Sequence, residues 1–148
     1  MTIDDLCRQH RRVALDANVF IYLFEVEGSL GRASASVLDA ISDGRITGIT
    51  SSLTLTEAIV GPVVSGDEAM AERYVDAIRS IEHLHVVPAT VEIAADAGFI
   101  RGRTGLTLAD SVHLATARTT GASVLLTNDR RIRPTPHVDV VQLSDLVP

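Results

Sequence analysis

The stretch Val13-Ala14-Leu15-Asp16-Ala17-Asn18 decides the fold, because it places an acidic residue directly after a short apolar run. The run predicts a short buried β-strand over residues 12–16, and residues 18–24 have the composition of a following helix. In a parallel α/β sheet, the carboxyl ends of the strands lie at one edge, and ligands bind outside that edge. Asp16 is therefore predicted to stand at such an edge.

Three further acidic residues occupy comparable positions. They close the runs Ser52-Leu53-Thr54-Leu55-Thr56-Glu57, Leu106-Thr107-Leu108-Ala109-Asp110 and Leu125-Leu126-Thr127-Asn128-Asp129. Four carboxylates gathered at one sheet edge would repel one another. A hard divalent cation held by oxygen ligands would relieve that repulsion. Beside an open pocket, such a site indicates metal-assisted hydrolysis of a phosphoester.

Each acid taken alone also has a purely structural explanation. Asp16 fits an Asx turn or an N-cap, and the Asn-Asp pair at the end of the last run is ordinary turn chemistry. Glu57 and Asp110 each follow a threonine by three residues (Thr54 and Thr107), which is the capping-box spacing. For any one of them the structural explanation would be preferred. The occurrence of all four at one predicted edge favours a shared site.

The remaining sequence predicts strands that alternate with helices, and hence a parallel sheet covered on both faces. Further strands are predicted at residues 46–50, 84–87, 123–127 and 138–141. Helices are predicted at residues 30–41, 54–60, 67–81, 90–100 and 107–119, with a short helix or arm over residues 3–12. Gly61-Pro62 is expected to interrupt the helix that begins at residue 54, and residues 102–105 are expected to be a break.

Composition limits the class of protein. A chain of 148 residues with 46% hydrophobic and only 3% aromatic residues suits one domain with a core of Ala, Val, Leu and Ile. The single cysteine, Cys7, excludes an internal disulfide and a thiolate metal site. Together with the lack of a signal-peptide pattern, this leads us to expect a cytoplasmic protein. No apolar run approaches the ~18 residues that span a bilayer, so no membrane partner is expected.

The charge pattern bears on nucleic-acid binding. The net charge of −6 argues against such a partner unless the acids are gathered in a metal site. All thirteen basic residues are arginine, whose guanidinium binds phosphate in a bidentate way. The candidates for holding an RNA backbone are Arg101, Arg103, Arg130 and Arg131. Each of them singly is at least as well explained as a solvated surface arginine.

The histidines give weak signals. His113 follows Asp110 by three residues and is predicted to lie under or beside the site. We interpret it as a packing or supporting residue rather than a metal ligand. No pair of histidines or cysteines has the spacing of a zinc site.

The four acidic segments together resemble the PIN domain family, and in particular the small VapC-type toxins of bacterial toxin–antitoxin pairs. The motifs that carry the resemblance are Leu15-Asp16-Ala17-Asn18-Val19, Leu53-Thr54-Leu55-Thr56-Glu57-Ala58, Leu106-Thr107-Leu108-Ala109-Asp110-Ser111 and Leu126-Thr127-Asn128-Asp129. The resemblance implies a three-layer α/β/α PIN-like fold with a short parallel central sheet. Residues 1–148 would form a single domain, with residues 1–12 as an N-terminal arm or helix before the first strand.

The resemblance also implies a function. An acidic quartet would bind Mg²⁺ or Mn²⁺ and cut single-stranded RNA, as in the toxin of a type II toxin–antitoxin system. Asp16 and Asp110 are the most secure metal ligands, Asp129 is the next, and Glu57 is a ligand or a supporting residue. The same pocket would be lined by Asn18, Thr127 and Asn128.

Two protein partners are implied as well: a cognate antitoxin, with a segment that covers the acidic pocket, and a second copy of the chain in a homodimer. Residues 59–64 could serve such an interface, but they are more simply interpreted as core.

Two other functions are compatible with parts of the pattern. A receiver-like or phosphatase-like enzyme also places acids and Mg²⁺ at strand ends, but it normally uses a lysine for the phosphoryl group, and this chain has none. A non-catalytic PIN-like binding or regulatory module would use the acids only as caps and turns.

Overall fold

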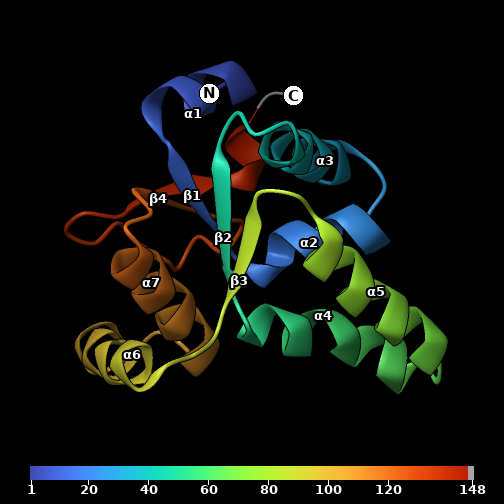
Figure 1. Cartoon of the computed structure of the whole chain (residues 1–148). Helices are drawn as coiled ribbons and strands as arrows, with labels where there is room; N and C mark the ends of the chain where they lie inside the picture. Colours follow the sequence, from blue (N-terminus) through green and yellow to red (C-terminus); the bar gives the residue numbers. More distant parts are fainter. Residues whose placement is uncertain (147–148) are drawn as a thin grey trace.

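In the computed structural model, which describes residues 1–146, five parallel strands form one central sheet that is covered by helices on both faces (Figure 1). The strands are β1 (Arg12–Leu15), β2 (Thr47–Ser51), β3 (Leu84–Val87), β4 (Val124–Thr127) and β5 (Asp139–Gln142). The three-layer α/β/α architecture expected from the sequence is confirmed.

The strand order is β3-β2-β1-β4-β5, which makes β1 the point where the chain changes direction across the sheet. From β1 the chain builds outward through β2 and β3, and it then returns to add β4 and β5 on the other side of β1. Leu15, the last residue of β1, pairs with Leu126 of β4 on one side and Thr50 of β2 on the other. Open α/β sheets bind ligands outside the strand ends at such a switch point.

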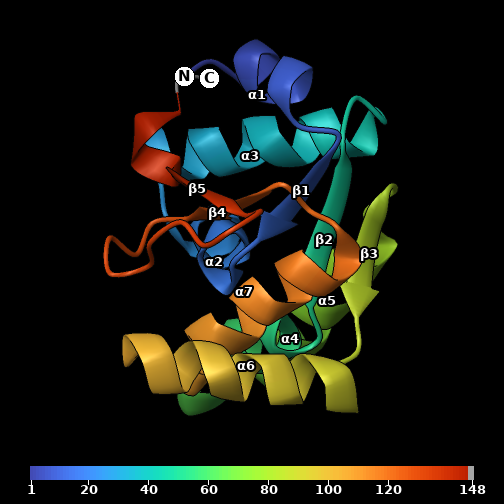
Figure 2. The same ribbon diagram turned by 90° about the vertical axis from the view of Figure 1, so that its left-hand side faces the viewer.

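Alternate residues of β1 and β4 point to opposite faces and so define two cores. Val13 and Leu15 contribute to the larger core, which is built with α1 (Ile3–Gln9), α2 (Ala17–Glu25), α3 (Ser29–Ser42) and η1 (Leu143–Asp145). Ala14 and Leu125 contribute to the other core, under α6 (Val91–Thr104) and α7 (Leu108–Thr120). Figure 2 shows α6 and α7 together on that side of the sheet.

The two remaining helices, α4 (Leu53–Val64) and α5 (Glu68–Ser80), pack against each other after β2. The prediction that Gly61-Pro62 interrupts α4 is wrong, because the helix continues through Pro62 to Val64. Pro62 lies in the last turn, so the helix loses only the hydrogen bond that the proline nitrogen cannot donate.

The predicted break at residues 102–105 is also placed too early. Helix α6 includes Gly102 and ends only at Gly105, which has a φ of 72°. This left-handed backbone is the usual end of a helix and favours glycine. Gly102 has no such requirement, and the helix passes through it.

The N-terminal segment is a helix rather than an extended arm. Thr2 and Asp5 form a capping box at the start of α1. Ile3 and Leu6 are buried in the larger core, and the Met1 amino group donates a hydrogen bond to the Asp145 carbonyl at 3.2 Å. Helix α1 therefore ties the beginning of the chain to η1 near its end.

The interpretation of residues 59–64 as core is wrong for most of them. Of these residues only Pro62 is buried, whereas Val60, Val63 and Val64 are 53%, 45% and 82% exposed. Helix α4 therefore presents an apolar stripe to solvent. Within residues 1–146, no helix combines the length and the hydropathy that a bilayer span requires.

Candidate active site

Asp16 stands directly after β1, at the N-cap position of α2. Its carboxylate makes no capping hydrogen bond to the helix. Instead Oδ2 accepts hydrogen bonds from Thr127 Oγ1 at 2.6 Å and from Asn18 Nδ2 at 3.1 Å. Asp16 is only 4% exposed, so a carboxylate is buried at the carboxyl ends of β1 and β4, the switch point of the sheet, which we call the crevice.

Glu57 comes from α4 and is about one-third exposed. The capping-box explanation for Glu57 is wrong, because α4 begins at Leu53 with Ser52 as its N-cap residue. Thr54 lies inside the helix, where it is buried and its hydroxyl shares a hydrogen bond with that of Thr50 at 2.7 Å. Glu57 is therefore free of a capping role.

Asp110 lies in the first turn of α7. Its backbone N–H donates to Thr107 Oγ1 at 3.2 Å, which confirms Thr107 as the N-cap residue. The carboxylate itself is buried, and its Oδ2 atom has no hydrogen-bond partner among the described residues. The residue thus completes a helix start with its backbone and leaves its side chain available for a ligand.

His113 follows on the next turn of α7 and connects these acids. Its Nε2 atom lies 2.8 Å from Glu57 Oε2 and 3.6 Å from Asp16 Oδ1, and its side chain is 1% exposed. The sequence predicted a supporting residue beside the site but not this contact. The only sequence signal was its spacing of three residues from Asp110, which places both on one face of a helix.

Asp16, Glu57 and Asp110 form what we call the carboxylate cluster. Burial raises the pKa of Asp16, and the charges of Glu57 and Asp110 raise it further against the lowering effects of His113 and Thr127. Burial alone would lower the pKa of His113, but the hydrogen bond with Glu57 and the charges of the cluster outweigh burial and raise it. The negative charge concentrated in the crevice thus favours the protonated form of the His113 ring.

Asp129 follows β4 but faces a different partner. Arg131 donates to both of its carboxylate oxygens, with Nε at 3.0 Å from each and Nη2 at 2.5 Å from Oδ2. These hydrogen bonds lower the pKa of Asp129. The charge of Asp110 also acts on Arg131, so the ion pair lies within electrostatic reach of the carboxylate cluster.

The other predicted pocket residues divide into two kinds. Asn18 and Thr127 both donate to Asp16 and therefore line the crevice. Asn128 instead donates to the Tyr22 hydroxyl at 3.4 Å and accepts from the Ser144 backbone at 3.2 Å. Its side chain is used to anchor the end of β4.

The remaining candidate arginines are exposed. Arg130 lies against Ser144 and Asp145, at 3.4 and 3.8 Å. Arg101 and Arg103 belong to the last turn of α6, and the Arg103 guanidinium stands 5.5 Å from the centre of the Phe99 ring. Both precede the short loop that leads into the first turn of α7, where Asp110 lies.

The donor set fits a divalent cation. Asp16, Glu57 and His113 each offer a ligand atom, and these atoms lie within 4.8 Å of one another. Asp110 adds a buried carboxylate oxygen that lacks a partner within the described part of the chain. Carboxylate oxygens are ligands for Mg²⁺ and Mn²⁺, and unpartnered buried ones are unfavourable without a cation or a donor.

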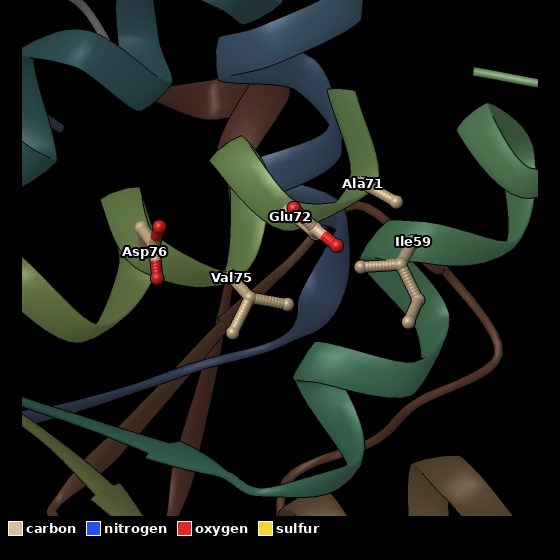
Figure 3. A pocket seen from close by; sticks show the side chains of 5 residues that line it. All are labelled: Ile59, Ala71, Glu72, Val75 and Asp76. Carbon is tan, nitrogen blue, oxygen red and sulfur yellow. The ribbon is translucent and has the colours of Figure 1, made fainter. Parts of the chain in front are cut away.

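Other cavities lie away from the crevice. Figure 3 shows one of about 310 Å³ between α4 and α5, in which Ile59, Ala71 and Val75 form an apolar surface beside Glu72 and Asp76. A smaller one of about 120 Å³ is lined by residues that include Arg131 and Arg133. None of the three members of the carboxylate cluster lines either cavity.

Comparison with solved structures finds similar folds in toxin–antitoxin proteins. FitAcB from Neisseria gonorrhoeae is 20% identical with a TM-score of 0.72, and the match covers 90% of this chain and 99% of that one. VapBC2 from Rickettsia felis, bound to a promoter DNA fragment, is 18% identical with a TM-score of 0.68 over 88% and 98%. VapC20 from Mycobacterium tuberculosis, a toxin that cleaves the sarcin–ricin loop, is 13% identical with a TM-score of 0.62 over 76% and 86%.

A comparison with curated proteins gives no significant match. The sequence model of the PIN domain family, by contrast, matches residues 13–138, which run from β1 to the residue before β5 and include all four predicted acids. The chain therefore belongs to the PIN domain family.

Proposed function

We propose that this protein is a metal-dependent endoribonuclease that cuts single-stranded RNA, and that it is the toxin of a VapC-type type II toxin–antitoxin pair. The observation that carries the proposal is that Glu57 of α4 and Asp110 of α7 both lie within electrostatic reach of Asp16, which follows β1 at the strand ends. Membership of a nuclease-type family and the fold shared with toxin–antitoxin proteins support it.

The metal ligands that we propose are Asp16 and Asp110, with Glu57 as a third. When bound there, Mg²⁺ or Mn²⁺ would supply a Lewis acid that activates water and offsets the negative charge of a phosphodiester. Asp129 would join the site after releasing Arg131. This order of ligands differs from the sequence-based one, in which Asp129 stood ahead of Glu57.

The residues of the chain itself would prepare the crevice for this chemistry. Thr127 and Asn18 fix the Asp16 carboxylate through two donors to one oxygen, so its other oxygen is left for a cation. The N-termini of α2 and α7 lie at Asp16 and Asp110, and the helix dipoles favour negative charge there. The carboxylates are thus held in place before a metal or a substrate arrives.

Arginine side chains near the crevice would hold the RNA backbone. Arg131 lies beside Asp129, and Arg101 and Arg103 end the helix before Asp110. Guanidinium groups bind phosphate oxygens through paired hydrogen bonds. The chain has 3% aromatic residues, so recognition by the backbone and shape of RNA is favoured over stacking of bases.

We further propose two protein partners. The exposed valines of α4, Val60, Val63 and Val64, suit a second copy of the chain, because they form a contiguous apolar stripe. The cavity between α4 and α5, with its apolar surface and the acids Glu72 and Asp76, suits an amphipathic antitoxin segment with basic side chains. This placement differs from the one that the resemblance implied, in which the antitoxin segment covers the acidic pocket.

The proposal is tested by incubating the purified protein with single-stranded and structured RNA, in Mg²⁺ or Mn²⁺ and in EDTA. An Asp16→Asn/Asp110→Asn double variant, shown to be folded, serves as the control. Cleavage that requires metal and is lost in the variant would support the nuclease. Equal cleavage by the variant would mean that a contaminant cuts the RNA. If neither protein cuts and neither binds metal, a non-catalytic PIN-like module becomes the better explanation.

A further inference from the structure

His113 is the buried group that the proposed mechanism does not yet use. Its Nε2 atom lies at hydrogen-bonding distance from Glu57 Oε2, 2.8 Å, and at 3.6 Å from Asp16 Oδ1. Within residues 1–146, this is the only hydrogen bond made by the Glu57 side chain. Since Glu57 is about one-third exposed, His113 is the group that determines where its carboxylate lies.

Two roles are compatible with this position: ligand to the metal, or hydrogen-bond donor to Glu57. A histidine that binds a metal through Nε2 carries its proton on Nδ1 and nearly always donates it to a carboxylate, a carbonyl or water. The Nδ1 atom of His113 is buried and has no such partner among the described residues. The surroundings of the ring therefore lack the feature that accompanies a ligand histidine.

The carboxylates also favour donation by His113 to Glu57 over metal binding by the ring. Glu57 Oε2 is a strong acceptor at a short distance from Nε2, and an ionised acceptor roughly doubles the strength of a hydrogen bond. Donation through Nε2 also leaves the other oxygen of Glu57, Oε1, available for a cation. Asp16 and Asp110 provide further oxygen atoms, so the cation does not need a nitrogen ligand.

We propose that His113 is a positioning residue, which holds the Glu57 carboxylate at the metal site through an Nε2–H···Oε2 hydrogen bond and does not itself bind the metal. The proposal rests on the proposed metal site. It implies an all-oxygen ligand set, and oxygen ligands favour Mg²⁺ and Mn²⁺, whereas imidazole ligands suit Zn²⁺ and other transition metals.

Mn²⁺ alone is the probe, because it binds oxygen sites and reports its ligands by pulsed electron paramagnetic resonance. Mn²⁺ affinity is measured by calorimetry for the wild-type chain, His113→Leu and His113→Gln. Leucine removes the donor, whereas the glutamine amide nitrogen stands as many bonds from Cα as Nε2 does and restores it. The control is His10→Leu, which removes a buried histidine that contacts Ser123 at the amino-terminal ends of β1 and β4, the opposite ends from the site.

The expected result is a loss of about 10- to 100-fold in Mn²⁺ affinity for His113→Leu, the range for removal of a group that orients a metal ligand. His113→Gln should recover most of the affinity, and His10→Leu should lose stability but no affinity. Urea unfolding of each variant establishes that the measured protein is folded. The wild-type complex should show no nitrogen coupling of the size of a directly bound imidazole.

Three results would overturn the proposal. The first is strong imidazole nitrogen coupling to Mn²⁺ in the wild-type chain, lost in His113→Gln. The second is equal Mn²⁺ affinity for the wild-type chain and His113→Leu. The third is a loss in His113→Gln as large as that in His113→Leu. Failure of the nuclease proposal looks different, because the protein would then bind Mn²⁺ through a His113-dependent site and cut no RNA.

Discussion

Replacing Thr127 by valine tests how the crevice holds a buried charge. The Thr127 hydroxyl donates to Asp16 Oδ2 at 2.6 Å and accepts the Asp129 backbone N–H at 3.0 Å, inside a fully buried position. Valine keeps the branched shape of threonine, so packing changes little. Both hydrogen bonds are lost, and the carboxylate of Asp16 keeps only its bond from Asn18 on that oxygen.

The expected cost follows from the two bonds. A hydrogen bond to a charged group contributes about 1.5–3 kcal/mol, and a neutral one contributes about 0.5–1.5 kcal/mol. We therefore expect Thr127→Val to lower the free energy of unfolding of the metal-free protein by about 2–4 kcal/mol. The measurement is urea unfolding at pH 7 in the presence of EDTA.

A double-mutant cycle separates the charged part. In an Asp16→Asn background, the Thr127 hydroxyl donates to a neutral amide oxygen, so Thr127→Val should cost about 1 kcal/mol less than in the wild-type background. Thr50→Val is the matched control, since its buried hydroxyl donates to the Leu15 carbonyl at 2.9 Å and does not contact Asp16. Its cost should be the same in both backgrounds.

Additivity would refute the reasoning. If the costs of Thr127→Val and Asp16→Asn add to within about 0.5 kcal/mol, the Thr127 hydroxyl does not stabilise the charge of Asp16. A change below about 0.5 kcal/mol for Thr127→Val alone would mean that the buried carboxylate finds another donor, such as water.

Three further predictions concern other parts of the site and the surface. Arg131→Gln should free the Asp129 carboxylate, raise Mn²⁺ affinity a few-fold and weaken binding of single-stranded RNA. Because this ion pair is exposed, the free energy of unfolding should change by under about 1 kcal/mol. Unchanged Mn²⁺ affinity in calorimetry would contradict this prediction. Because the pKa of His113 is raised above 6.5, the folded state binds more protons than the unfolded state above that pH. Urea unfolding should therefore show that the metal-free protein loses stability as pH rises above about 6.5, whereas a flat profile would argue against a charged His113. Val60→Ser/Val64→Ser should lower the molar mass measured by light scattering towards that of a monomer and change the free energy of unfolding by less than about 0.5 kcal/mol. A dimer of unchanged mass would place the interface elsewhere.

The sheet was predictable because strand composition and turn residues are local signals. The run that ends at Asp16 is short, apolar and followed by polar residues, which is how a buried parallel strand reads in sequence. Helix ends were less predictable. Pro62 and Gly102 are unfavourable inside helices on local grounds, yet α4 and α6 run through both. Their tertiary packing outweighs the local preference.

The sequence predicted which acidic residues belong to the site, but not which side chains contact one another there. Three acids meet because the topology brings their elements together, and each stands at a recognisable strand or helix end. The contact between Glu57 and His113 joins residues 56 positions apart on two different helices, and no local pattern encodes it. The pairing of Asp129 with Arg131 is local. The Arg131 backbone N–H also donates to Asp129 Oδ1, which is the hydrogen bond of an Asx turn, so the turn chemistry read from the sequence already includes this pair.

The cluster also explains why Asp16 does not cap its helix. A capping carboxylate would accept backbone N–H groups of α2, whereas that of Asp16 accepts from Thr127 and Asn18. Helix α2 thus has a start without a side-chain cap, at a cost of about 0.5–2 kcal/mol. The dipole of α2 nevertheless stabilises the negative charge of the Asp16 carboxylate. Burial disfavours that charge, as the raised pKa of Asp16 indicates. A loss of stability of this kind is expected where a residue binds a ligand. The missing cap therefore supports Asp16 as the central residue of the proposed metal site.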